Sequence, residues 1–216
     1  MRNYPAILLI VAAACCQAAQ ADVLWDQAPN LNANGFFNSI SGSPPLGVTS
    51  YAVGDVTVPA GGWTVNSVTM YFSNLNGGAW TSTVTQGRLY VQSVTGTVPT
   101  VLPSGALISV TATSIFSPTY QQSYYAVTAS GLNLNLAPGS YWIGLTPAAA
   151  SGPFGPEIGL SASTVLNQRS ATIQAGSTSW SQITSDAAIT VQGIPTPGAS
   201  AMIGLGGLCL LRRRRS

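Results

Sequence analysis

The chain has 216 residues and a formal net charge of +2, with 6% charged and 46% hydrophobic residues. Disordered chains combine low hydrophobicity with high charge, so this composition predicts a folded protein, and its length predicts one domain between short terminal segments. The cations are all arginines, and only Arg88 and Arg169 lie between the two ends, against five acidic residues. Nucleic acid is excluded as a partner because binding to phosphates needs cations spread over a face.

The first 21 residues have the order of a secretory signal peptide. An arginine follows the first methionine, an apolar run covers residues 6–14, and the small residues Ala19 and Ala21 precede an aspartate. This order is typical of export, so we expect a signal helix over residues 1–21 with cleavage after Ala21. Two alternatives stay open: a buried N-terminal helix, and a lipoprotein lipidated at Cys15 or Cys16.

Residues 22–193 predict an all-β domain. Short runs rich in β-branched and aromatic residues alternate there with Gly, Pro, Asn and Ser, and no segment has a convincing helical period. In residues 65–72, Val68, Met70 and Phe72 would share a buried face and Thr69 and Tyr71 the exposed one. The other expected strands are residues 52–58, 87–94, 107–112, 124–129, 132–136, 141–145, 158–161, 171–174 and 188–192.

A hairpin is expected over residues 132–145. Residues 132–136 alternate apolar and polar side chains, as a half-buried strand does. Pro138 fits the first central position of a type II turn and Gly139 the second, which needs a positive φ, so residues 141–145 would form the return strand. Eight to ten short strands without a repeat period predict an antiparallel β-sandwich, jelly-roll-like or of another Greek-key type.

Residues 194–216 have a three-part layout. Pro195, Thr196 and Pro197 precede an apolar run over residues 199–211, and the chain closes on the basic cluster Arg212, Arg213, Arg214 and Arg215. As a helix the apolar run reaches about 20 Å, so spanning a 30 Å hydrocarbon core needs flanking residues or snorkelling arginines. Arginines after such a run stay on the cytoplasmic side, so we expect the rest of the chain outside the inner membrane.

This layout resembles the C-terminal sorting signal of PEP-CTERM proteins, with Pro195-Thr196-Pro197 as a variant of their Pro-Glu-Pro motif. The resemblance implies recognition by an exosortase, which is a membrane transpeptidase, and delivery to the outside of bacteria that make exopolysaccharide. A permanent, uncleaved membrane anchor is the alternative. Residues 22–193 resemble the choice-of-anchor β-sandwich domains found upstream of such signals, through Leu24-Trp25-Asp26, Gly61-Gly62-Trp63 and residues 136–142.

Few reactions are open to residues 22–193, which contain no His, Lys or Cys. A Ser-His-Asp triad, a histidine-ligated zinc and a Schiff-base lysine are excluded, and no disulfide can form. We therefore expect no enzyme, no catalytic residue, no cofactor and no metal. Two alternatives stay open: a glycosidase that uses Asp55 with Glu157, and calcium bound near the N-terminus by Asp22, Asp26, Asn30, Asn32 and Asn34.

The aromatic residues fall into two groups. Trp63 and Trp142 lie within strand patterns and are expected in the core. Trp80, Tyr120 and Tyr124 lie in loop-like sequence beside Asn, Gln and Ser, where exposed rings could stack on sugars. The sequence thus predicts an exported, non-enzymatic cell-surface or extracellular-matrix protein with a structural or adhesive role, whose partners during export are the sorting transpeptidase and the inner membrane. The alternative is a carbohydrate-binding module that recognises exopolysaccharide through these three residues.

Overall fold

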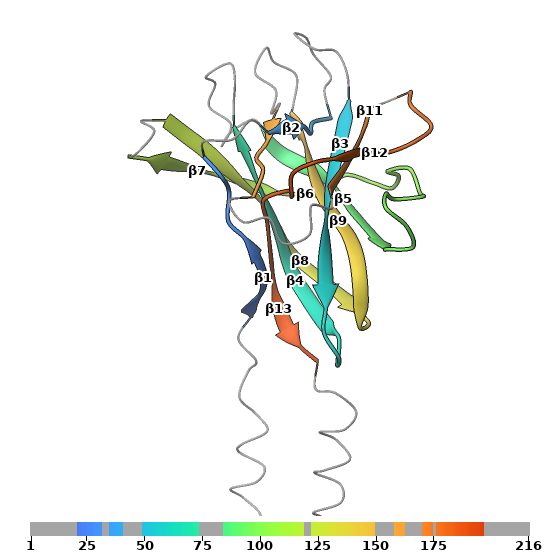
Figure 1. Cartoon of the computed structure of the whole chain (residues 1–216). Helices are drawn as coiled ribbons and strands as arrows, with labels where there is room; N and C mark the ends of the chain where they lie inside the picture. Colours follow the sequence, from blue (N-terminus) through green and yellow to red (C-terminus); the bar gives the residue numbers. More distant parts are fainter. Residues whose placement is uncertain are drawn as a thin grey trace, which may run out of the picture.

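A computed structural model describes residues 21–31, 35–40, 49–73, 84–118, 122–149, 158–162, 170–174 and 176–196. These residues form two antiparallel β-sheets and contain no helix (Figure 1). The two expected terminal helices, over residues 1–21 and 199–211, lie outside the described ranges apart from Ala21. In the described ranges, nothing has the helical length and apolar character needed to cross a membrane.

Sheet 1 has β4 at its centre. Strand β8 pairs with one side of β4, and β13 and β10 pair with successive parts of the other side. Strand β7 is added outside β8, β1 outside β13, and β2 outside β10. The strands of sheet 1 are β1 (Asp22–Gln27), β2 (Phe36–Phe37), β4 (Trp63–Ser73), β7 (Thr111–Ser117), β8 (Gln122–Leu136), β10 (Ile158–Gly159) and β13 (Ile189–Pro195).

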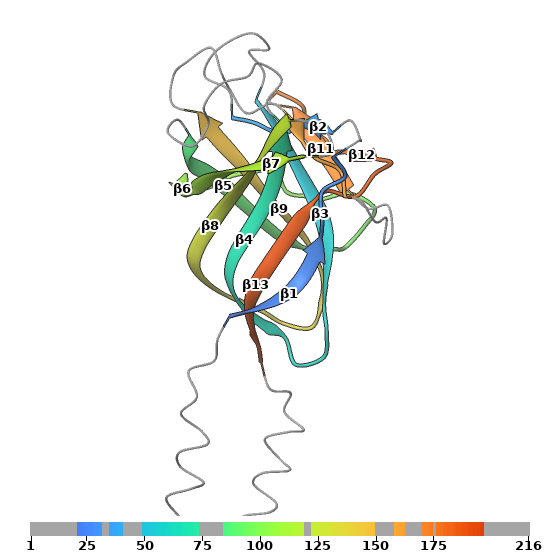
Figure 2. The ribbon, with the colours of Figure 1, turned by 90° about the vertical axis from the view of Figure 1, so that its left-hand side faces the viewer.

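Sheet 2 lies behind sheet 1 in Figure 2 and has the order β12-β11-β3-β9-β5-β6. Its central strands are the long ones, and its edges are two or three residues long. The strands of sheet 2 are β3 (Ser50–Val58), β5 (Val84–Ser93), β6 (Ile108–Ser109), β9 (Gly139–Ala149), β11 (Ser170–Gln174) and β12 (Ser181–Ile183).

The main core fills the space between the sheets, so the expected β-sandwich is supported. Val68, Met70 and Phe72 of β4 are fully buried in it, as the alternation of residues 65–72 predicts, while Thr69 and Tyr71 point to the other side. Ile143 and Leu145 of β9 meet them from sheet 2 in the same cluster.

The predicted hairpin over residues 132–145 is wrong. Strand β8 pairs with β4 and β7 in sheet 1, whereas β9 pairs with β3 and β5 in sheet 2. Gly139 has a positive φ as expected, but its value of 145° is well above the roughly 80° of a type II turn. The chain bends at Pro138 and crosses from sheet 1 to sheet 2. Both strands bury their apolar side chains in the same core. Two strands in facing sheets show the same alternation of apolar and polar residues as two paired strands of one sheet, so the sequence pattern does not distinguish them.

A bulge explains why residues 124–129 and 132–136 look like separate strands in the sequence. Strand β8 is continuous, but its residues 131–133 lie opposite the single residue Asn66 of β4, and Gly131 and Asn133 have positive φ. Tyr125, Val127 and Ala129 face the core before the bulge, and Leu132, Leu134 and Leu136 after it. The extra residues of the bulge shift the core-facing side chains of β8 from odd-numbered to even-numbered positions.

The other expected strands are all present, with changed bounds. Residues 107–112 are divided at Val110 between β6 and β7, and Ser161 lies outside β10. Strands β1, β2 and β12 were not expected, because β2 and β12 are very short and residues 22–27 do not alternate cleanly. Trp63 and Trp142 are buried as predicted.

Both ends of the described domain lie at the same end of sheet 1. Asp22 pairs with Gly193, and Pro195 pairs with Trp63. The Thr196 N–H then donates to the Gly62 carbonyl at 3.0 Å, so β13 continues past residue 193, the expected domain boundary. Gly193 is required there, because a Cβ would lie 2.1 Å from the Thr64 carbonyl oxygen.

Candidate ligand surface on sheet 1

The outer face of sheet 1 carries a row of hydroxyl side chains, one on each of four neighbouring strands. In register, Thr111 pairs with Thr128, Thr128 with Thr69, and Thr69 with Thr190. Thr190 pairs in turn with Asp26 of β1. Directly paired residues share a face and neighbouring strands lie about 4.8 Å apart, so hydroxyl and methyl groups repeat across the sheet. We call these five residues the threonine row.

Hydrogen bonds fix the orientation of one end of the threonine row. The Thr190 hydroxyl donates to Asp26 Oδ1 at 2.7 Å, which uses its single proton. The Tyr71 phenol, 3.0 Å from Thr190 Oγ1, must therefore donate to Thr190, because a hydroxyl carries one donor and two acceptor sites. The Tyr71 oxygen keeps its lone pairs and can accept a hydrogen bond from a ligand.

Two tyrosines lie beside the row. The rings of Tyr71 and Tyr124 are 6.3 Å apart between centroids and tilted by 53°, and both side chains are half-buried. Burial, with a smaller contribution from Tyr71, raises the pKa of Tyr124 above its usual range, so its phenol stays neutral. Two partly exposed rings beside hydroxyl groups offer both stacking and hydrogen bonding.

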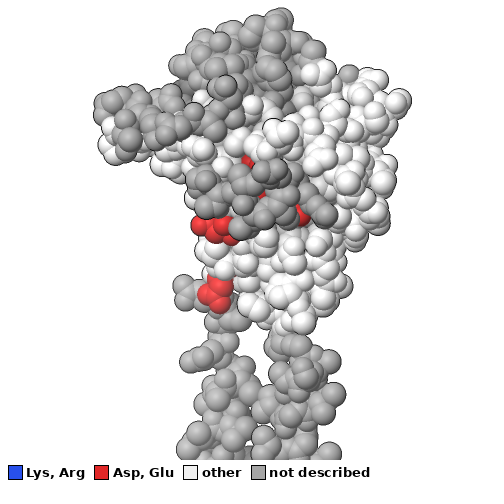
Figure 3. Space-filling view, in the orientation of Figure 1, with Lys and Arg blue, Asp and Glu red and all other residues white. Residues whose placement is uncertain are grey.

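Charge is scarce on this part of the molecule. Arg88 is the one basic residue in the described ranges, and it lies on sheet 2, where its guanidinium contacts the Tyr51 hydroxyl and covers the Tyr51 ring. In the view of Figure 3 the described surface shows small acidic areas and no basic residue. The outer face of sheet 1 therefore suits an uncharged ligand better than an anionic one.

Of the residues predicted to bind glycan, the structure places Tyr124 on this face. Tyr124 pairs with Ser73, the last described residue before the segment that holds Trp80. Trp80 and Tyr120 lie outside the described residues, as do Ala19, Pro197 and the basic cluster Arg212–Arg215. Tyr71 and the four threonines of the row were not predicted as site residues, and Asp26 was named only as a possible calcium ligand. Their exposed face could be read from the alternation of residues 65–72, but the sequence does not show which residues of other strands pair with them.

Neither of the two alternative carboxylate sites falls wholly within the described residues. Asp55 is buried on β3, Glu157 lies outside the described residues, and Asp26 accepts the hydrogen bond from Thr190. Within the ranges that the structure describes, no group of three or more His, Cys, Asp or Glu residues could hold a metal ion.

The outer face of sheet 2 is built differently, because a second apolar cluster covers it. Trp142 and Val53 are fully buried there, and Tyr90 and Trp180 are nearly so. The Tyr90 and Trp180 rings are 5.3 Å apart at 56°. These aromatic side chains are part of the folded interior and are not available to a ligand.

Residues 94–107, which we call the strap, are fastened over this face by hydrogen bonds. The Val101 carbonyl accepts from the Tyr90 hydroxyl at 2.8 Å and from Trp180 Nε1 at 2.9 Å. Gln92 Oε1 accepts from the backbone N–H groups of Thr100 and Val101 at 3.2 and 3.3 Å, and also contacts the Tyr90 hydroxyl. Burial raises the pKa of Tyr90 to about 12, although the bond to Val101 opposes the rise.

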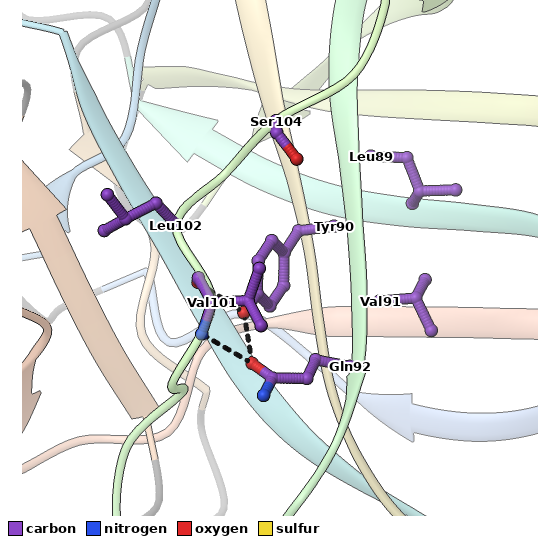
Figure 4. Close-up of a pocket in the computed structure, with 7 residues that line it drawn as sticks. All are labelled: Leu89, Tyr90, Val91, Gln92, Val101, Leu102 and Ser104. Atoms are coloured by element: carbon purple, nitrogen blue, oxygen red, sulfur yellow. Dashed lines mark hydrogen bonds between the residues drawn. The ribbon is translucent and has the colours of Figure 1, made fainter.

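A small cavity remains between the strap and β5. It measures about 180 Å³ and is lined by Leu89, Tyr90, Val91, Gln92, Val101, Leu102 and Ser104 (Figure 4). Pockets for small-molecule ligands usually measure roughly 300–1,000 Å³, so this cavity is too small for a sugar chain. The outer face of sheet 1 is thus the better candidate surface. No protein-family model, no curated protein and no solved structure matches the chain.

Proposed function

We propose that the protein is an exported, non-enzymatic component of the cell surface or extracellular matrix, with a structural or adhesive role. Residues 1–21 would act as the signal peptide and residues 194–216 as a PEP-CTERM-like sorting signal, recognised at the inner membrane by an exosortase-like transpeptidase. The domain between them would be jelly-roll-like. The order β1-β13-β4-β8 opposite β3-β9-β5-β6 supports this, since it corresponds to two interlocked Greek keys.

One observation carries this proposal: the two ends of the domain leave sheet 1 at the same place. Asp22, the expected new N-terminus, pairs with Gly193, and Thr196 is bonded to Gly62. Export machinery at both ends of the chain would therefore act at one end of the sandwich. The far end of sheet 1, where Tyr124 lies, would point away from the membrane.

The test is the intact mass of the protein recovered from the cell surface or the medium. We expect a chain from Asp22 to near Pro197. A mass that still includes Arg212–Arg215 would contradict transpeptidase processing and favour the permanent anchor, and recovery from the cytoplasm alone would contradict export. Replacing the four arginines by serine should abolish surface delivery, whereas Arg169→Ser, which changes an arginine outside both terminal segments, should leave it intact.

A second candidate function is recognition of exopolysaccharide by the outer face of sheet 1. The tilted pair of Tyr71 and Tyr124 beside the threonine row favours it, because the face offers rings for stacking and hydroxyls for bonding to an uncharged sugar. Trp80 and Tyr120, which lie outside the described residues, remain predicted glycan-binding residues of this second function.

Binding to purified exopolysaccharide and to a glycan array would test this second function. We expect saturable binding that weakens at least about fivefold in Tyr124→Ala, since the stacking of a nucleic-acid base on an aromatic ring, a comparable contact, is worth about 1–3 kcal/mol. Tyr141→Ala is a matched control, because Tyr141 is also partly buried but lies beside the turn at Ala137. Unchanged binding in Tyr124→Ala, Trp80→Ala and Tyr120→Ala would contradict a glycan site at these residues.

A further inference from the structure

The edges of the two sheets differ in how well they are protected against pairing with another chain. In the described part of the chain, sheet 2 ends in β6 and β12, which offer two and three residues. Strand β1 of sheet 1 carries Asp22 and Asp26 and has a register shift after Val23. Strand β7 has seven residues, Thr-Ala-Thr-Ser-Ile-Phe-Ser, with no charge and no proline. Proteins usually protect a long edge with charges, proline or a bulge, and β7 has none of these.

The free side of β7 is accessible over most of the strand, although Ser117 at its end is buried. Among the described residues β7 pairs only with β8, and the Val110 N–H bond to the Thr85 carbonyl fixes the chain just before the strand begins. Thr113 and Ser114 are exposed, and Phe116 is 57% exposed, which is unusual for a large apolar side chain in a strand. Figure 1 shows β7 and the start of β8 extending away from the rest of the sandwich.

We propose that β7 pairs with β7 of a second copy of this chain, antiparallel about a twofold axis at Ser114. Ser114 is the middle residue of the strand, so this register pairs all seven residues. It places Phe116 of each copy opposite Ala112 of the other, on the same face. The exposed ring would gain an apolar neighbour across the new strand pair, and sheet 1 would continue from one copy into the next.

Charge favours the pairing of two copies through β7 over their pairing through β1. Two β7 strands bring no like charges together. Two β1 strands would bring Asp22 and Asp26 of both copies to one ladder, and like charges on facing strands destabilise it. A twofold interface is also closed, so pairing through β7 gives dimers and not open fibres.

The expected affinity is low. Seven residues from each copy fall well short of the roughly 20–30 residues a side of a stable interface. Dimers should therefore form where copies are concentrated, as on a surface, and covalent trapping is a better readout than size in dilute solution. The inference goes beyond the proposed function and holds whether or not the protein binds glycan.

Cysteine crosslinking of the full chain tests the pairing. With Cys15, Cys16 and Cys209 replaced by serine, Ser114→Cys introduces the one thiol of the protein. Directly opposed residues have Cα atoms about 4.5–5.5 Å apart, within the range that a disulfide bridges. Under mild oxidation we expect Ser114→Cys to give disulfide-linked dimers at least about tenfold faster than Val23→Cys, a control at the exposed β1 edge.

A second substitution makes the result specific to the edge. Ser114→Cys with Phe116→Lys should crosslink no faster than Val23→Cys, because each copy then brings a cation to the interface. Circular dichroism would verify that this variant keeps its β structure. Equal rates for Ser114→Cys and Val23→Cys, crosslinking that survives Phe116→Lys, or trapping of Ser114→Cys on a different protein would each overturn the proposal.

Discussion

The two outer faces of the sandwich both carry aromatic residues, but they differ in what satisfies the polar groups of those residues. On sheet 2 the Tyr90 hydroxyl and the Trp180 N–H both donate to the Val101 carbonyl of the strap. On sheet 1 the Tyr71 hydroxyl donates to the Thr190 side chain of a neighbouring strand, and the rings of Tyr71 and Tyr124 stay half-exposed. On sheet 2 the hydrogen-bond acceptor is a backbone carbonyl, and the strap that carries it also covers the rings. On sheet 1 the acceptor is a side chain of the same sheet, so the rings stay accessible.

This difference shows that aromatic residues on a sheet face do not by themselves mark a binding site. Trp142 lies on the outer side of sheet 2 and is nevertheless fully buried. Replacing an aromatic residue by alanine should therefore lower the stability of the fold on sheet 2 and weaken ligand binding on sheet 1.

The largest expected effect is that of Trp142→Ala. Removing a fully buried indole leaves a cavity under the strap, and we expect the free energy of unfolding to fall by about 3–5 kcal/mol. Chemical denaturation would measure it. Trp142→Phe is the control and should cost clearly less, because it keeps much of the packing and removes an indole N–H that has no acceptor among the described residues. A loss below about 1 kcal/mol in Trp142→Ala would mean that the strap does not close this face.

Trp180→Phe should have a smaller effect. The ring against Tyr90 is kept, but the 2.9 Å bond to the Val101 carbonyl is lost, and one hydrogen bond contributes about 1 kcal/mol. Hydrogen exchange at Thr100 and Val101 should become faster, since both amides lie in the strap. Unchanged exchange at these two amides would show that Trp180 does not hold the strap in place.

The pH dependence of stability should report on Tyr90. Burial raises the pKa of Tyr90 in the folded protein to about 12 from an ordinary value of 10.0. Between these values the unfolded chain releases the phenol proton while the folded chain keeps it, so ionisation favours unfolding. This contribution to stability is complete below pH 10 and is lost as pH rises to 12. The melting temperature should fall more steeply over this interval in the unmodified protein than in Tyr90→Phe, and equal slopes would contradict a buried Tyr90 hydroxyl.

The smallest expected effect is that of Thr128→Val on sheet 1. The 2.8 Å bond to the Thr69 hydroxyl is lost, but water can replace it on a half-exposed face and valine suits a strand. We expect a change below about 0.5 kcal/mol in the free energy of unfolding. Thr146→Val is the buried control. It removes the 2.6 Å hydrogen bond from the Thr146 hydroxyl to Asn38 Oδ1, which keeps only the 3.2 Å bond from the Ala52 N–H, and losing one buried hydrogen bond should cost about 1 kcal/mol. Equal losses in both variants would mean that the outer face of sheet 1 is covered like that of sheet 2.

The sequence alone was sufficient to predict the fold where the alternation within one strand determines which of its side chains are buried. The alternation of residues 65–72 identified the buried side of β4, and low charge with β-branched runs identified the all-β class. The sequence was insufficient to predict pairings of strands or side chains that lie far apart in the chain. Gly139 has the positive φ that the sequence predicts, but nothing near it in the sequence indicates that β8 and β9 belong to different sheets. Nor could the pattern around Trp180 show that its N–H meets Val101, 79 residues earlier.

The hydrogen bond from Thr196 to Gly62 limits how far the domain could stand from a membrane. Only Pro197 and Gly198 separate Thr196 from the apolar run that begins at Ala199. Three extended residue steps span at most about 11 Å, which is close to the depth of a lipid headgroup layer. With that run in the bilayer as proposed, the sandwich would have no stalk. It would rest on the headgroups until it is released, and its orientation would be set by the short tether.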